Sequence, residues 1–195
     1  MNEKRFFKIR VYFTSIIAIS IWALLIWNHY HGGVPSHHIL NDKNLPEISN
    51  WWGALLLPLL SWILFYRIKK RAVENIDNES KESDSQINII YGFIGALFSG
   101  ILLSVFFTLG YANFPAYVLL LILMSGLFFP IYRAEYILGF VLGMTFTFGA
   151  VLPTVIAFIL ALIGAFLYLC IRTLILYVVS RILFVLVSSD QKEAK

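Results

Sequence analysis

The chain has 195 residues, of which 59% are hydrophobic and only 13% are charged. Soluble domains have about 45–50% apolar and about 25% charged residues, so a water-soluble fold of this length cannot bury so much apolar surface. The net charge of +4 is modest, and no basic–aromatic pattern indicates nucleic-acid binding. The composition therefore predicts an integral membrane protein whose main partner is the lipid bilayer. Its single cysteine, Cys170, excludes an internal disulfide.

Several apolar segments approach the length of a transmembrane helix, which needs about 20 residues with a range of roughly 17–25. The first ends in Trp27-Asn28-His29-Tyr30, without a small-residue cleavage site, so we expect an uncleaved helix and not a signal peptide. The fifth, 136–152, is short enough to be re-entrant instead of spanning. None of the segments contains Asp, Glu, Lys, Arg or His, and they cover residues 11–27, 51–66, 87–109, 114–132, 136–152 and 153–171.

A further apolar stretch, 173–187, carries Arg181 near its middle. An arginine at the centre of a membrane helix costs about 3 kcal/mol on insertion scales, which disfavours a seventh span. We expect this stretch to continue the sixth helix into the cytoplasmic interface or to lie on that interface.

Lysine and arginine are concentrated in alternate connecting segments, and such segments face the cytoplasm. Placing both termini inside leaves only Lys43 outside among the 15 Lys and Arg residues. We therefore expect an all-α, polytopic transmembrane helical bundle of six spans. The scarce cysteine favours the bacterial inner (plasma) membrane. A flexible cytoplasmic linker, 72–86, separates an N-terminal two-helix hairpin (1–71) from a four-helix bundle with a C-terminal juxtamembrane extension (87–195).

Three of the predicted helices carry small residues at four-residue spacing, which lets helix backbones approach closely in lipid. We interpret these rows as packing within the chain; the alternatives are a homo-oligomer interface, a contact with a membrane partner, or a substrate groove. Tyr91…Gly110…Pro115 is also faintly echoed by Tyr136…Gly149…Pro153; we interpret this as coincidence, because glycine and proline are common in membrane turns, and a hairpin repeat of the transporter type is the alternative. The rows are Gly92, Ala96, Gly100 and Ser104; then Gly139, Gly143 and Thr147; then Ala157, Ala161 and Ala165.

The loop 28–50, expected outside the cytoplasm, contains all four histidines: His29, His31, His37 and His38. Neutral imidazole is the commonest metal ligand, and zinc takes four ligands in a tetrahedron. Gly32-Gly33 permits a tight reversal that brings the two histidine pairs together. The loop is therefore a candidate site for zinc or another transition metal, although its spacing matches no zinc signature and an ordinary interfacial loop is the simpler interpretation. A pH sensor is a further alternative.

The same loop also contains candidate catalytic residues. Ser36 is a candidate N-cap for a short helix, which would place His38 and Asp42 on one face. The catalytic candidates are Ser36 as nucleophile, or His38 with Asp42 as an acid–base pair. Trp51 and Trp52 close the loop; we expect them to be interfacial anchors, or an aromatic wall that binds an acyl chain or a quinone-like ring.

The apolar spans lack the buried charges that ion-coupled transporters use. The sequence therefore leaves three functions open. The first is an extracytoplasmic histidine site, possibly metal-dependent, that acts on a lipidic or periplasmic substrate. The second is a facilitator or transporter of a small neutral or amphiphilic solute, and the third is a membrane scaffold or assembly partner.

Overall fold

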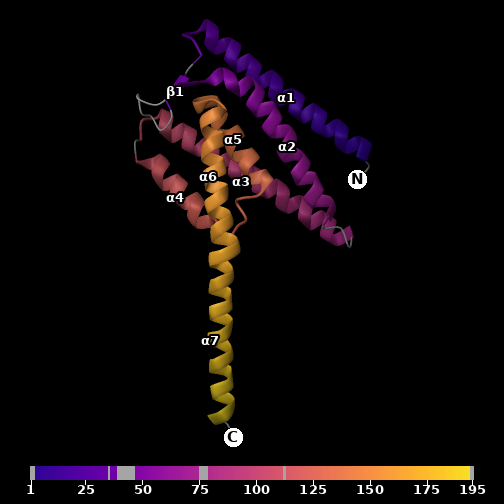
Figure 1. The fold of residues 1–195 in the computed structure, drawn as a ribbon, viewed down its shortest axis with the longest axis vertical. Coiled ribbons are helices and arrows are strands. Elements are labelled where there is room, and N and C mark those ends of the chain that lie inside the picture. Colours follow the sequence, from indigo (N-terminus) through magenta and orange to yellow (C-terminus); the bar gives the residue numbers. More distant parts are fainter. Residues whose placement is uncertain (1–2, 35, 39–46, 75–78, 112, 194–195) are drawn as a thin grey trace.

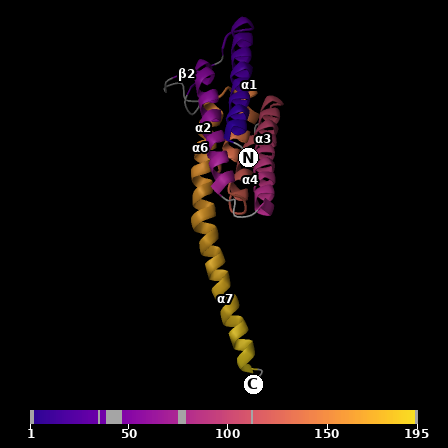
Figure 2. The same ribbon diagram turned by 90° about the vertical axis from the view of Figure 1, so that its right-hand side faces the viewer.

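The structure is a computed structural model that describes residues 3–34, 36–38, 47–74, 79–111 and 113–193. Two long helices, α1 (Glu3–Tyr30) and α2 (Gly53–Glu74), lie side by side as a hairpin. The remaining helices pack behind α2, and a long C-terminal helix extends away from them (Figures 1 and 2). The predicted helical architecture is confirmed for the described part of the chain, apart from two short strands.

The connection between α1 and α2 begins with a glycine-dependent helix end. Gly32 and Gly33 have φ angles of 113° and 94°, and the Gly33 amide donates to the carbonyl oxygen of Asn28 at 2.9 Å. This hydrogen bond over one helical turn is typical of a Schellman motif, which needs a left-handed residue after the helix. The two glycines therefore stop α1 where the histidine-rich loop starts.

The short helix predicted at Ser36 is wrong. Ser36–His38 forms strand β1, which pairs antiparallel with β2 (Glu47–Ser49), with Ser36 opposite Ser49. Pairing with β2 satisfies the backbone hydrogen-bonding groups of this segment in an extended conformation. A 3-10 turn, Asn50–Trp52, then leads into α2. Asp42, which the prediction placed on the same helix face as His38, lies outside the described residues.

Aromatic side chains hold α1 against α2 at the end away from the strands. The Phe65 ring lies 5.4 Å from the Phe6 ring and 5.0 Å from the Phe13 ring, measured between centroids. The Arg10 guanidinium lies 3.6 Å from the centroid of the Trp62 ring, and its Nε donates to the Trp62 carbonyl at 3.1 Å. These contacts bury apolar surface and also cover a cation with aromatic faces.

The second part of the chain is built around α5. Its helices are α3 (Glu79–Thr108), α4 (Phe114–Ser125), α5 (Ala134–Phe148) and α6 (Val151–Phe166). In α5, Leu138, Val141 and Met144 are no more than 1% exposed, so this short helix forms the centre of the molecule. The recurring hairpin pattern corresponds to two similar helix ends, since Gly110 and Gly149 have φ angles of 80° and 73°.

The small-residue rows of α3 and α5 pack against each other, which confirms the interpretation as packing within the chain. Residues later in α3 contact residues later in α5, so the two helices run parallel. The Ser104 hydroxyl also donates to the Gly143 carbonyl at 3.4 Å. Close backbone approach of this kind is how small residues join helices in lipid. The facing residues are Gly92 and Tyr136, Ala96 and Gly139, and Gly100 and Gly143.

Four helices of the described chain are long and apolar enough to cross a membrane: Phe6–Tyr30, Asn50–Ala72, Ser85–Thr108 and Val151–Phe184. The predicted spans 114–132 and 136–152 instead contain helices of 12 and 15 residues. Helix α4 ends before Gly126 and Pro130, and α5 ends at Gly149, whose φ is positive. The structure thus shows an apolar, membrane-type helical protein; the six-span path and the cytoplasmic termini stay predictions.

The sixth helix continues past its predicted end, as one of the two readings of residues 173–187 anticipated. A π-helical turn, η3 (Leu167–Ile171), joins α6 to α7 (Arg172–Glu193) without a break. Helix α7 runs away from the other helices (Figures 1 and 2). Leu174, Ile182 and Phe184 are 62%, 54% and 69% exposed there, as expected for side chains that face lipid.

Candidate functional site

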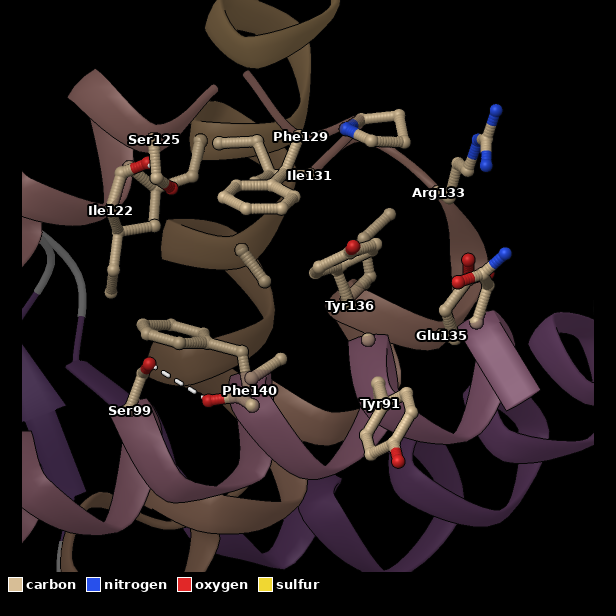
Figure 3. Close-up of a pocket in the computed structure, with 18 of the residues that line it drawn as sticks. Tyr91, Ser99, Ile122, Ser125, Phe129, Ile131, Arg133, Glu135, Tyr136 and Phe140 are labelled. Atoms are coloured by element: carbon tan, nitrogen blue, oxygen red, sulfur yellow. Dashed lines mark hydrogen bonds between the residues drawn. The ribbon is translucent and has the colours of Figure 1, made fainter. Parts of the chain in front are cut away.

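A cavity of about 520 Å³ lies between α3, α4, α5 and α6. We call it the bundle cavity. Its walls are mainly apolar, and the turn that joins α4 to α5 covers one side of it (Figure 3). Ligand sites in proteins have volumes of roughly 300–1,000 Å³, so the cavity has the size of a binding site. The apolar side chains of the lining include Leu121, Ile122, Phe129, Ile131, Phe140 and Leu160.

Small residues of α3 open the cavity. A Cβ added at Gly95 would meet nothing within 4 Å, so this position faces open space. The hydroxyl groups nearby are already bonded: Ser99 donates to the Gly95 carbonyl at 2.8 Å, and Ser125 donates to the Ile122 carbonyl at 2.6 Å. Because both serine hydroxyl groups are hydrogen-bonded to carbonyl oxygens of their own helices, the middle of the cavity behaves as an apolar surface.

One end of the cavity is polar and is built on the first turn of α5. Glu135 is 1% exposed, and its carboxylate accepts two hydrogen bonds from Arg71 of α2, at 3.0 Å and 2.7 Å. Such a bidentate ion pair fixes both groups and neutralises the buried carboxylate. The pair links the N-terminal hairpin to the cavity wall.

Arg133 lies at the same end and is the N-cap residue of α5. Its side chain is directed away from the apolar centre of the cavity (Figure 3). Within the described residues, its guanidinium makes no hydrogen bond or ion pair. With Glu135 neutralised by Arg71, Arg133 is the one unpaired charge among the described residues that line the cavity.

Glu135 is not among the predicted site residues, because it lies in the connection between two apolar segments and not inside either. A signal was nevertheless present: Glu135 is the sole acidic residue between Asp84 and Asp190. A lone carboxylate between apolar membrane segments is expensive to keep unless it has a partner or a function. The partner, Arg71, is 64 residues away and is not identified by local sequence.

The aromatic and histidine side chains of the loop gather at the opposite end of the hairpin. The His31 ring stacks on Trp27 at 3.8 Å between centroids, and its Nδ1 lies 2.9 Å from the Trp27 carbonyl oxygen. The His29 ring lies 6.0 Å from the Trp51 ring. Trp51 and Trp52 are 41% and 65% exposed. His29 and Trp51 thus lie side by side, while His31 is held by its own helix.

The predicted metal and catalytic sites stay predictions. Within the described residues, no group of three or more His, Cys, Asp or Glu side chains is placed to hold a metal ion. The side chains of His37 and His38, and the whole of Asp42, lie outside what the structure describes. Ser36 is exposed at the start of β1. The comparisons with known proteins gave no match to a family model, to a curated protein or to a solved structure.

Proposed function

We propose that the protein binds an anionic amphiphile in the bundle cavity, with the acyl chain between α3, α4 and α6 and a carboxylate or phosphate head group at Arg133. The observation that carries this proposal is an apolar cavity of about 520 Å³ whose described lining has one unpaired charge, the Arg133 guanidinium, at one end. This function develops the second function left open by the sequence, a protein that takes up an amphiphilic solute.

The apolar part of the ligand is supported by the cavity walls. Ile122, Phe129 and Phe140 contribute large apolar surfaces, and the space beside Gly95 is unfilled. Burying apolar ligand surface against such walls is favourable, and binding in a pocket restricts the chain to one place. The serines of the walls are bonded to their own helices and offer no strong site for a polar ligand.

The sign of the head group follows from the charges. Arg71 is committed to Glu135, whereas Arg133 has no such partner within the described residues. A basic residue near a membrane surface attracts an anionic head group by about 1 kcal/mol, which corresponds to about fivefold in affinity. We therefore expect a preference for an anionic over an uncharged head group with the same chain.

The test uses the full chain in nanodiscs of phosphatidylcholine, with a diazirine-bearing fatty acid as probe and the corresponding fatty alcohol for comparison. Gly95→Phe should fill the cavity and lower cross-linking to α4 and α6 at least about fivefold, because the new ring occupies the site of the chain. The matched control is Ile94→Phe, since Ile94 is 53% exposed on the same helix.

Arg133→Gln should lower the preference for the fatty acid over the alcohol about fivefold and leave alcohol labelling unchanged. Arg67→Gln is the charge control, because Arg67 is exposed on α2 and does not line the cavity. Mass spectrometry of the cross-linked peptides gives the readout. Labelling spread evenly over the outer helix faces, or labelling equal in Gly95→Phe and Ile94→Phe, would show ordinary surrounding lipid and refute the proposal.

A further inference from the structure

A second cavity, of about 870 Å³, lies between α1, α2 and α5 near the strand end of the hairpin. We infer that it binds an uncharged amphiphile whose hydrogen-bonding head group is held by the side-chain amide of Asn50. This inference concerns a different cavity and a different ligand chemistry from the proposed function and does not depend on it.

The walls of the second cavity are apolar on three helices. Ile17 and Ile21 come from α1, Leu57 from α2, and Leu142 and Phe146 from α5. Such a lining suits a hydrocarbon chain. No described residue of the lining is Asp, Glu, Lys, Arg or His. Because an unpaired charge is very costly to bury, this lining excludes a charged head group inside the cavity.

Asn50 supplies the polar group. It is 5% exposed, and its backbone carbonyl accepts from the Gly53 amide. Its side-chain amide makes no hydrogen bond within the described residues, and its polar atoms are not fully enclosed by protein, so they are open to the cavity. An asparagine side chain offers two donors and one acceptor with two lone pairs. Buried polar groups nearly always have a partner, so an amide that opens onto a cavity is suited to hydrogen-bond a molecule held there.

The turn between α5 and α6 is shaped around this amide. Gly149 has a φ of 73°, and a Cβ at this position would overlap the Asn50 side chain. Thr145, which also lines the cavity, donates its hydroxyl to the Val141 carbonyl at 2.7 Å and so does not compete for the ligand. The amide is therefore held in place by backbone packing. It faces a cavity much larger than a single water molecule, which occupies about 30 Å³ in liquid water.

The ligand class that fits is an uncharged lipid with hydroxyl or ester groups next to one or two hydrocarbon chains. A hydroxyl can donate to the amide oxygen, and an ester carbonyl can accept from the amide nitrogen. Asn28 lines the same end of the cavity and adds a second amide within the lining. The cavity therefore distinguishes lipids by the hydrogen-bonding capacity of the head group and not by charge.

The test uses the full chain in phosphatidylcholine nanodiscs with a diazirine-bearing monoacylglycerol as probe. Asn50→Leu keeps a side chain branched at the same atom but removes its hydrogen-bonding groups, and it should lower labelling of the cavity segments of α1 and α5 about fivefold. Ser20→Phe should block the cavity from the exposed face of α1, with Ser15→Phe as matched control, since Ser15 is exposed on the same helix outside the lining.

Two measurements keep the outcome decisive. Helical content and thermal unfolding show whether each variant is folded. Ser20→Phe changes an exposed position, so this variant tests the cavity even if Asn50→Leu does not fold. A carboxylate-headed probe should label these segments less than the monoacylglycerol does. Equal labelling in wild type, Asn50→Leu and Ser20→Phe, or stronger labelling by the carboxylate probe, would overturn the inference. The bundle cavity is lined by α3 and α4, which do not line the second cavity. A negative result in the test of the bundle cavity would therefore not affect the test described here.

Discussion

The ion pair between Arg71 and Glu135 is the residue contact on which the arrangement of the two parts of the chain depends most directly. The carboxylate is 1% exposed, while the Arg71 side chain is 26% exposed. Removing one partner of a buried pair leaves an uncompensated charge, and this is more destabilising than replacing both partners by apolar residues. The pair therefore behaves as a unit.

Arg71→Met should lower the free energy of unfolding by about 3 kcal/mol, because Glu135 then loses both of its hydrogen bonds. The double variant Arg71→Met/Glu135→Met should recover most of this loss. Denaturation in mixed detergent micelles, followed by circular dichroism, gives the measurement. Arg67→Met, at an exposed position of the same helix, should change stability by less than about 0.5 kcal/mol. A double variant as unstable as the single one would contradict the paired role.

At the scale of elements, the contact between α3 and α5 shows what the sequence could and could not supply. The glycine and alanine rows are readable from spacing alone, and so is the expectation that they pack within the chain. The sequence did not specify which row meets which, because the contacts join residues about 40 positions apart, such as Ser104 and Gly143. It also misassigned β1 as a helix, since the pairing of Ser36 with Ser49 is a property of two segments and not of one.

Gly143→Ala should destabilise the protein by about 2 kcal/mol or more, because a Cβ there would overlap the backbone carbonyl oxygen of Leu97. A backbone atom inside a packed helix cannot move aside as a flexible side chain can. Gly95→Ala is the matched control: its Cβ meets nothing within 4 Å, and alanine favours the helix by about 1 kcal/mol. Thermal unfolding of both variants in the same detergent measures their stability. An equal loss of stability in both variants would refute the close-packing explanation.

At the scale of the whole molecule, helix length and composition support membrane-spanning helices, whereas the orientation of the chain is a prediction from charge. Four helices have the length and composition of membrane spans. Composition was sufficient to predict this, because apolar content on such a scale has no other stable surroundings. The cytoplasmic position of the termini rests on the distribution of lysine and arginine, and the candidate cavities depend on long-range packing that no local pattern encodes.

Cysteine labelling tests the orientation. In a Cys170→Ala background, Ser36→Cys should react with a membrane-impermeant maleimide in intact cells, because Ser36 is exposed at the strand end. Arg67→Cys, at the opposite end of α2, should react only after the membrane is permeabilised. Reaction of Arg67→Cys alone would reverse the predicted orientation, and reaction of both variants from outside would contradict the cytoplasmic position of Arg67.

The long helix formed by α6 and α7 has a geometric consequence. Its apolar part, Val151–Phe184, contains 34 residues and would measure about 51 Å at 1.5 Å per residue, whereas the hydrocarbon layer of a bilayer is about 30 Å thick. A straight rod of that length cannot stand perpendicular to the membrane and keep all its apolar side chains out of water. Tilting or bending must absorb the excess, and the widened turn Leu167–Ile171 is where the intrahelical ladder already departs from regular spacing. Any change of angle between the core and the C-terminal rod should therefore concentrate at those five residues.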